Sequence, residues 1–307
     1  MQYQAVDVKR RTAWLSVASN SVLVVLKLVI GIVTGSVSLI SEGLHSSVDL
    51  IASLIASAAV YKAATPPDKE HDYGHGKYEN LSAAVEAVLI LAAAGGIIYE
   101  SLHRLDEPQM PVSLEYGMGI MVLSMIINYF VSRRMLAVAK ATCSQALEAD
   151  AQHLRADILT SFGVLLGMAG MYVTGWSWLD PVVAIAVACI IFHIGYMMVV
   201  EAVRELTDRS LSAEEEAAIA NIFAEQRGVV SFHCLRTRRS GGYKLLDVHL
   251  LFPAKMELWQ VHDICDEVER KIRSQLGPFD VLIHPEPAET QQYESKRDQY
   301  EKSMSVE

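Results

Sequence analysis

The 307-residue chain has few charged residues. Lys, Arg, Asp and Glu make up 20% of it, and apolar residues make up 51%. This composition is too apolar for a disordered chain and more apolar than that of an ordinary soluble protein. The net charge is −10. The sequence therefore lacks the basic surface that nucleic-acid binding requires, and we expect no nucleic-acid partner.

Several motifs are also absent. The four cysteines form no C-x-x-C pair, which excludes a disulfide scaffold and a four-cysteine zinc knuckle. No H-E-x-x-H motif of a zinc protease occurs. The segment Gly74-His75-Gly76-Lys77 lacks the glycine spacing and the Ser/Thr of a phosphate-binding loop. The first apolar stretch is interrupted by Lys27 and precedes no small-x-small cleavage site, so we expect no cleavable signal peptide.

Charge divides the chain into two parts. Residues 1–204 hold 13 Lys/Arg and 17 Asp/Glu, and residues 205–307 hold 13 and 19 in half the length. We expect a membrane domain over 1–208, a water-exposed domain over 209–288 and a disordered polar tail over 289–307.

The membrane part contains six apolar stretches. A helix of roughly 20 residues crosses the hydrocarbon core, and these runs are too long and too continuous for barrel strands. The sequence therefore predicts six transmembrane helices. The stretches cover approximately residues 13–34, 38–62, 81–103, 113–132, 143–173 and 179–203.

Lys and Arg lie at alternate ends of these stretches. They gather before the first stretch and after the second, fourth and sixth, whereas the first and fifth connections carry none. The positive-inside rule then places both termini in the cytoplasm. With no targeting segment evident, we expect a multi-pass protein of the plasma (inner) membrane, surrounded by the lipid bilayer.

The C-terminal part predicts a small α/β domain. An N-capped helix over 212–225 is followed by strands over 229–237 and 245–252, an amphipathic helix over 258–276 and a strand over 280–284. Two helices on one face of a three-stranded sheet give an α/β fold. The predicted fold is thus an α-helical membrane protein with a cytoplasmic α/β domain.

Two His/Asp pairs lie inside the apolar stretches. His45 and Asp49 in the second stretch, and His153 and Asp157 in the fifth, are each spaced i, i+4 and so share a helix face. From the helical rise, His45 lies roughly 10–15 Å and Asp157 about 24 Å from the outer ends of their helices. An Asp near a helix centre costs at least ~2.5–3.5 kcal/mol.

Four such groups at matching depth suit one Zn²⁺, because two imidazole nitrogens and two carboxylate oxygens form a tetrahedral ligand set. The alternative is two independent His–Asp hydrogen bonds between helices. Glu42 is an outer-mouth ligand, a proton acceptor or, as we expect, a solvated carboxylate of the vestibule. Four other polar residues within the stretches are expected to make interhelical contacts, namely Asn20, Lys27, Glu86 and Asn128.

Together these motifs resemble the cation diffusion facilitators. The two His-x-x-x-Asp pairs carry the resemblance, with Gly35-Ser36, the loop Tyr73-Gly74-His75-Gly76-Lys77, and Glu148-Ala149-Asp150 before His153. The likeness covers residues 1–288 and is closest to the bacterial zinc/iron branch. It implies a homodimer with a ferredoxin-like, metallochaperone-like cytoplasmic domain, in which the four residues form the transport site and metal leaves in exchange for protons.

The cargo implied is a divalent transition metal. His45 stands where some members of this branch have Asp, and a two-His, two-Asp set resembles the zinc-preferring arrangement. Zn²⁺ is therefore expected as transported and regulatory ion, with Fe²⁺, Cd²⁺, Co²⁺, Ni²⁺ or Mn²⁺ as alternatives, because ligand identity alone does not settle cargo.

The resemblance also implies a metal site in the loop after the second stretch. Asp68, His71 and His75 match it, and two histidines with a nearby carboxylate are a plausible ligand set. A solvated loop with incidental histidines is the alternative. Lys77 and Asp208 match a family salt bridge near the hinge between membrane and cytoplasm.

The family pattern further places a two-metal site across the dimer interface of the cytoplasmic domain. The matching residues are His233, His249, His262, His284 and Glu286. Ordinary surface histidines are the alternative reading. Cys234 and Cys265 could add softer ligands, although buried cysteine is commoner.

Two other functional classes compete with transport. An intramembrane metal enzyme would need an open coordination position, which four protein ligands do not leave, so we expect no enzyme. A metal sensor that does not transport would suit the cytoplasmic histidines equally well. It gives no reason for an ion in the middle of the bilayer.

Overall fold

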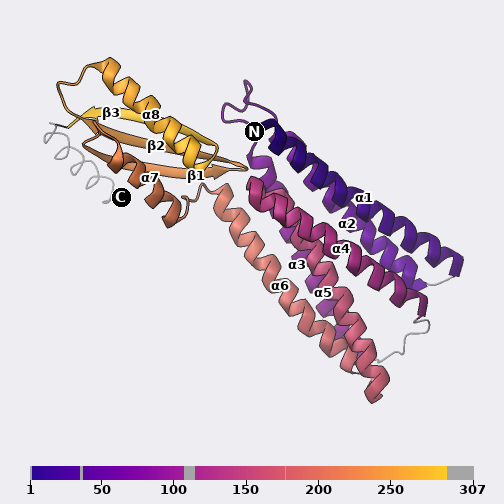
Figure 1. The fold of residues 1–307 in the computed structure, drawn as a ribbon. Coiled ribbons are helices and arrows are strands. Elements are labelled where there is room, and N and C mark those ends of the chain that lie inside the picture. The colour runs from indigo at the N-terminus through magenta and orange to yellow at the C-terminus, as the bar shows by residue number, and fades with distance from the viewer. Residues whose placement is uncertain (1, 35–36, 107–114, 177, 289–307) are drawn as a thin grey trace. The chain divides into compact units, whose positions relative to one another are not determined.

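The chain forms two units, Met1–Thr207 and Asp208–Glu307, drawn in Figure 1. This computed structural model describes residues 2–34, 37–106, 115–176 and 178–288. The predicted tail, residues 289–307, lies outside the described residues.

Six long helices make up the first unit, as predicted. Each corresponds to one predicted apolar stretch, although α1 begins well before its stretch, at Gln2 rather than at 13, and α4 ends well after its stretch, at Thr142 rather than at 132. They are α1 Gln2–Thr34, α2 Val37–Ala63, α3 Lys77–Asp106, α4 Glu115–Thr142, α5 Gln145–Thr174 and α6 Leu179–Leu206.

Five of these helices are long and apolar enough to cross a membrane over the residues described. In the remaining helix, α5, the charged residues Glu148, Asp150, Arg155 and Asp157 lie in the first half. This helix holds half of the predicted metal ligands of the membrane part.

The helices of this unit pack in neighbouring pairs. Figure 1 shows α3 beside α6. In the same way α1 packs against α2, and α4 packs against α5. In addition α5 contacts α2 and α3, so it lies among helices that are distant in sequence. Small residues such as Ala52, Ala56 and Ala156 are buried between the helices, whereas Val25 and Phe130 are exposed. Small residues let helix backbones approach closely in a bilayer, and the exposed apolar side chains suit contact with lipid.

The second unit has the predicted order helix, strand, strand, helix, strand. Its elements are α7 Ala213–Glu225, β1 Ser231–Ser240, β2 Tyr243–Phe252, α8 Leu258–Leu276 and β3 Phe279–Pro287. In the sheet β2 lies between β1, to which it is antiparallel, and β3, to which it is parallel. Over the described residues, the order of helices and strands along the chain is that of a ferredoxin-like domain without its first strand.

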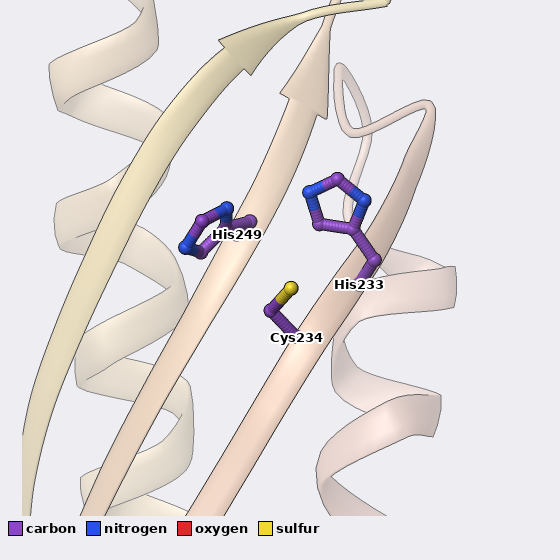
Figure 2. Close-up of side chains that lie close together, drawn as sticks. All are labelled: His233, Cys234 and His249. Carbon is purple, nitrogen blue, oxygen red and sulfur yellow. The ribbon is translucent and has the colours of Figure 1, made fainter. Parts of the chain in front are cut away.

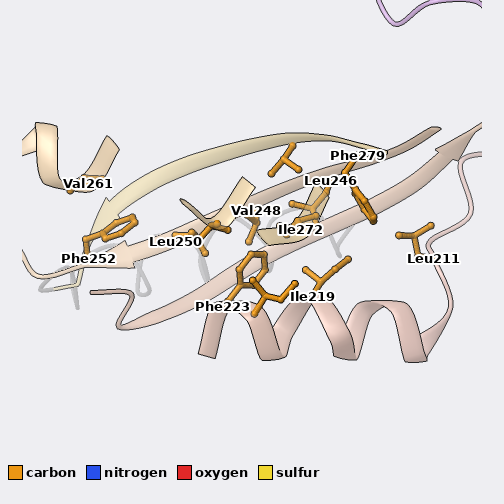
Figure 3. Packing of buried hydrophobic residues seen from close by; sticks show 13 residues of the cluster. Leu211, Ile219, Phe223, Leu246, Val248, Leu250, Phe252, Val261, Ile272 and Phe279 are labelled. Atoms are coloured by element: carbon orange, nitrogen blue, oxygen red, sulfur yellow. The ribbon is translucent and has the colours of Figure 1, made fainter. Parts of the chain in front are cut away.

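Both helices of the second unit cover the same face of the sheet. Alternate β2 residues, among them Val248 and Leu250, point into a core with Phe223 of α7 and Ile272 of α8 (Figure 3). Because side chains alternate across a strand, His249 and its odd-numbered neighbours lie on the other face. That face carries the histidines of β1, β2 and β3, namely His233, His249 and His284.

Local signals fixed the boundaries of this unit. Ser212 caps α7 in a capping box with Glu215, and the two-residue turn Gly241–Gly242 joins β1 to β2, as is usual for tight hairpins. The first strand begins at Ser231 rather than at 229. It also contains a register shift between His233 and Arg236, which the sequence pattern did not indicate.

Candidate metal sites

Residues from the two predicted intramembrane pairs meet in the helix bundle. His153 Nε2 of α5 lies 3.1 Å from Asp49 Oδ1 of α2. Ligand atoms of Asp49, His153 and Asp157 all lie within 4.8 Å of one another, and we call these three residues the α2–α5 group. His45 is one turn before Asp49 on α2, but its side chain, like that of Glu42, lies outside the described residues.

The α2–α5 group has the chemistry of a cation site. Asp49 and His153 are only 6% and 5% exposed, and His153 Nδ1 has no hydrogen-bond partner among the described residues. The hydrogen bond that does form joins one predicted pair to the other. Two carboxylates and an imidazole held this closely, with Asp49 and His153 buried and Asp157 half-buried, fit a divalent cation, which would compensate their charge.

A second group forms in the connection between α2 and α3. Asp68 lies 3.4 Å from both His71 Nδ1 and His75 Nε2, and the two imidazole rings are 4.4 Å apart. Neither ring nitrogen of His75 makes a hydrogen bond among the described residues, although this side chain is buried. The loop thus brings together the three residues predicted for it, in a geometry that a metal ion could bridge.

Backbone hydrogen bonds stabilise the ionised carboxylate of Asp68 in this loop group. The amides of Glu70 and His71 donate to Asp68 Oδ1 at 2.9 and 2.8 Å. These two hydrogen bonds lower the pKa of Asp68, because they stabilise its ionised form. Asp68 is therefore a carboxylate, the form that binds metal, throughout the neutral range.

A third group lies on the uncovered face of the small sheet. His249 pairs with His233 on one side and with His284 on the other, so three imidazoles stand in a row across the strands. Glu286 reaches all of them, with distances of 3.0 Å to His233, 2.8 Å to His249 and 3.6 Å to His284. We call these four residues the sheet group.

Cys234 joins this group through the irregularity in β1. Its φ of 52° marks the bulge, and an extra residue in one strand re-aims the side chains around it. Figure 2 shows the Cys234 thiol beside the rings of His233 and His249, and their ligand atoms lie within 4.8 Å of one another. Burial raises the pKa of Cys265 to about 11, so this thiol is protonated at neutral pH and is a poor ligand.

Three other predicted site residues have partners different from the predicted ones among the described residues. His262 is exposed on α8 and pairs with Asp266 at 3.8 Å, away from the sheet group. Lys77 donates to the Leu206 carbonyl at 3.5 Å, and Asp208 accepts from Arg238 at 3.1 Å. A Lys77–Asp208 pair would join the two units and stays a prediction.

The sequence did not predict the buried ion pair between α1 and α3. Lys9 of α1 lies 2.9 Å from Glu79 of α3, and the hydroxyl of Ser144, just before α5, donates to the same carboxylate. By sequence, Lys9 is one of the basic residues before the first apolar stretch, which the positive-inside rule explains. Glu79, an acidic residue in the first turn of α3, is the only signal of this ion pair in the sequence. Its partners could not be predicted, because they depend on how the helices pack. Lys27, by contrast, makes the predicted interhelical contact, donating to Ser46 Oγ of α2 at 2.7 Å.

Family models match both units. Residues 13–207 match the cation efflux transmembrane domain, and residues 211–288 match the cytoplasmic domain of cation efflux proteins, a model named ZT_dimer. The chain therefore belongs to the cation efflux family, the cation diffusion facilitators. It is a multi-pass membrane protein of a family of metal cation exporters rather than of enzymes. The dimer model supports a homodimer.

Two relatives that match over most of their length agree with this assignment. An uncharacterized transporter, sll1263 of Synechocystis sp., is 36% identical over 282 residues, 91% of each chain. The cation-efflux pump FieF of Pectobacterium atrosepticum is 34% identical over 254 residues, 83% of this chain and 84% of the pump. A solved structure of the transporter CzrB in its zinc form is 31% identical, covers 27% of this chain and 97% of its own, and has a TM-score of 0.26.

Proposed function

We propose that this protein exports a divalent transition metal, chiefly Zn²⁺, from the cytoplasm in exchange for protons. The observation that carries the proposal is the buried α2–α5 group, with Asp49 and His153 joined across two helices at 3.1 Å. His45, one turn from Asp49 on the same helix, is the proposed fourth ligand. An imidazole-rich oxygen and nitrogen set favours zinc over the harder cations.

Proton coupling follows from competition for the same atoms. Zn²⁺ binds neutral imidazole and ionised carboxylate, so metal binding releases protons and protons displace metal. At cytoplasmic pH the deprotonated ligands capture the ion, and protons entering from the opposite side release it. The unperturbed pKa of histidine, about 6.5, lies close enough to physiological pH for this exchange. Helices that rock about a fixed midplane site would provide alternating access.

The other two groups are proposed as metal sites outside the membrane. Asp68, His71 and His75 would bind an ion in the loop, and the sheet group would bind regulatory Zn²⁺ at the interface of the homodimer. His262 could join only from the partner subunit, because it lies apart from the sheet group within one chain. Metal held there would stabilise the dimer arrangement that it fits best.

The proposed setting is the inner (plasma) membrane, with both termini in the cytoplasm. The alternating Lys/Arg distribution supports this orientation. Lys77 and Asp208 are proposed to pair across the junction of the two units, where an ion pair would hold the inner ends of the dimer together.

Flux into proteoliposomes tests the proposal. Purified protein is reconstituted with an internal zinc indicator, and Zn²⁺ uptake is followed under an imposed pH gradient. We expect uptake that depends on the gradient in wild type, and a loss of at least about 100-fold in Asp49→Asn and Asp157→Asn. Each substitution removes a charged ligand, whereas even an outer-shell partner costs 10–100-fold.

The matched control is Glu100→Gln, which makes the same chemical change at an exposed position of α3. Wild-type flux in both aspartate variants would refute the assigned site. Metal binding without any flux in wild type would instead favour the sensor function. Parallel measurements with Fe²⁺, Cd²⁺, Co²⁺, Ni²⁺ and Mn²⁺ would rank the cargo.

A further inference from the structure

Two acidic side chains of the helix bundle, apart from the α2–α5 group, are fully buried without a hydrogen-bond partner among the described residues. Glu86 of α3 and Asp150 of α5 are both 0% exposed. All four carboxyl oxygens lack a hydrogen-bond partner among the described residues. The two groups are close enough to interact electrostatically, and α3 and α5 contact each other. This pair has no role in the mechanism proposed above.

The surroundings of the pair are polar but nearly uncharged. Ser82 precedes Glu86 by one turn of α3, and the hydroxyl of Ser16 on α1 faces Asp150. Asn20 follows Ser16 by one turn. The hydroxyls of Ser16 and Ser82 and the amide nitrogen of Asn20 are buried without a geometric hydrogen-bond partner among the described residues.

Charged groups of the α2–α5 group act on Asp150 electrostatically. Asp150 interacts electrostatically with His153, one turn further along α5, and with Asp49 of α2. On α1, Lys9 is already paired with Glu79, and Lys27 donates to Ser46.

Other helices offer the pair no evident counter-charge. The described titratable groups of α4, and those of α6 before its last turn, are exposed. Buried Glu205 lies in that last turn, next to Leu206, whose carbonyl accepts from Lys77.

Two adjacent carboxylates cannot both stay ionised in such a place. Burying an ionised carboxylate without a partner is so costly that the group takes up a proton instead, and a neighbouring carboxylate adds to the cost. Like-charged acids that share a site therefore hold a proton between them. Glu86 and Asp150 meet these conditions, because both are fully buried and neither has a hydrogen-bond partner among the described residues.

We propose that Glu86 and Asp150 form a proton-holding pair that gives up its proton when a metal ion binds to the α2–α5 group. The proposal rests on the metal–proton exchange argued above and adds a proton carrier that is not a metal ligand. A divalent ion at His153 and Asp49 would stabilise the ionised form of Asp150 through its positive charge. By reciprocity, a proton on the pair would weaken metal binding.

Calorimetry on the full-length protein in detergent tests this role. Zn²⁺ is titrated in buffers of different ionisation enthalpy, which gives the protons released per chain together with the number of Zn²⁺ ions bound. In Glu86→Gln we expect about one proton fewer than in wild type, with unchanged zinc stoichiometry. Asp150→Asn should show the same loss. Glu100→Gln, on the exposed surface of α3, should release as many protons as wild type.

The possible outcomes separate the proposals. Equal proton release in Glu86→Gln, Asp150→Asn and wild type would overturn the proton-holding pair while leaving zinc export standing. Loss of one bound Zn²⁺ in Glu86→Gln would also overturn it, because the pair would then be a metal site. Absence of Zn²⁺ flux in wild type would count against the proposed function instead.

Discussion

Glu286 is the residue on which the sheet group depends most directly. Its carboxylate lies within 3.0, 2.8 and 3.6 Å of three imidazoles. Without metal, these contacts are partly exposed, and each such pair contributes only about 0–1 kcal/mol. Glu286→Gln should therefore change the metal-free stability of the unit little.

The effect in the presence of metal should be much larger. At a free Zn²⁺ concentration of about 100 Kd, binding stabilises the folded unit by about 2.7 kcal/mol, which slows hydrogen exchange about 100-fold. Losing the carboxylate should weaken binding by at least the 10–100-fold that an outer-shell partner costs. At the same Zn²⁺ concentration, the slowing should then fall to about 2–10-fold.

Hydrogen exchange of the β2 amides, residues 243–252, measures this effect in the full-length protein with and without Zn²⁺. Asp280→Asn is the matched control, since Asp280 is an exposed carboxylate on the same strand, aligned with Leu245 rather than with a histidine. If Zn²⁺ protected β2 in Glu286→Gln as fully as in wild type, the sheet group would not be a metal site that includes this carboxylate.

Two further predictions concern the stability of the second unit, and hydrogen exchange of β2 also measures them. Burial opposes ionisation of Glu215, but hydrogen bonds from Lys244, the Ser212 amide and Arg239 lower its pKa to about 2. Its contribution is therefore complete above the unfolded pKa of about 4.3 and is lost as the pH falls through 2. Glu215→Gln should cost about 1–2 kcal/mol at pH 7 after allowance for solvent screening, and an equal loss at pH 2 and pH 7 would contradict this reasoning. Gly228 has a φ of 95°, so Gly228→Ala should destabilise the unit by about 1–2 kcal/mol, and unchanged exchange would show that the turn adjusts without strain.

Much of this protein could be predicted because the signals are local. Apolar runs give the helices, Ser212 marks the start of α7, and the paired glycines mark the hairpin. The i, i+4 spacing alone places His153 and Asp157 on one face of α5, since helical geometry fixes which neighbours share a face. The loop group was predictable for a similar reason, because Asp68, His71 and His75 lie within eight residues of one another.

Contacts between distant segments were not predictable from local signals. The bond from His153 to Asp49 depends on how α2 packs against α5. The sheet group depends on strand register, because a shift of one residue would turn His249 into the core. The bulge that brings Cys234 beside His233, and the position of His262 on α8 away from the other histidines, follow from the same long-range pairing.

The sequence by itself determined where the chain is apolar, which of its helices carry charged ligands, and how those ligands are spaced along each helix. Only the tertiary structure decided which of them meet, and it buried Glu86 and Asp150 without a hydrogen-bond partner among the described residues. The physical reason is that helix and strand periodicity are properties of neighbouring residues, whereas a cation or proton site needs donors whose approach is fixed by packing elsewhere in the bundle.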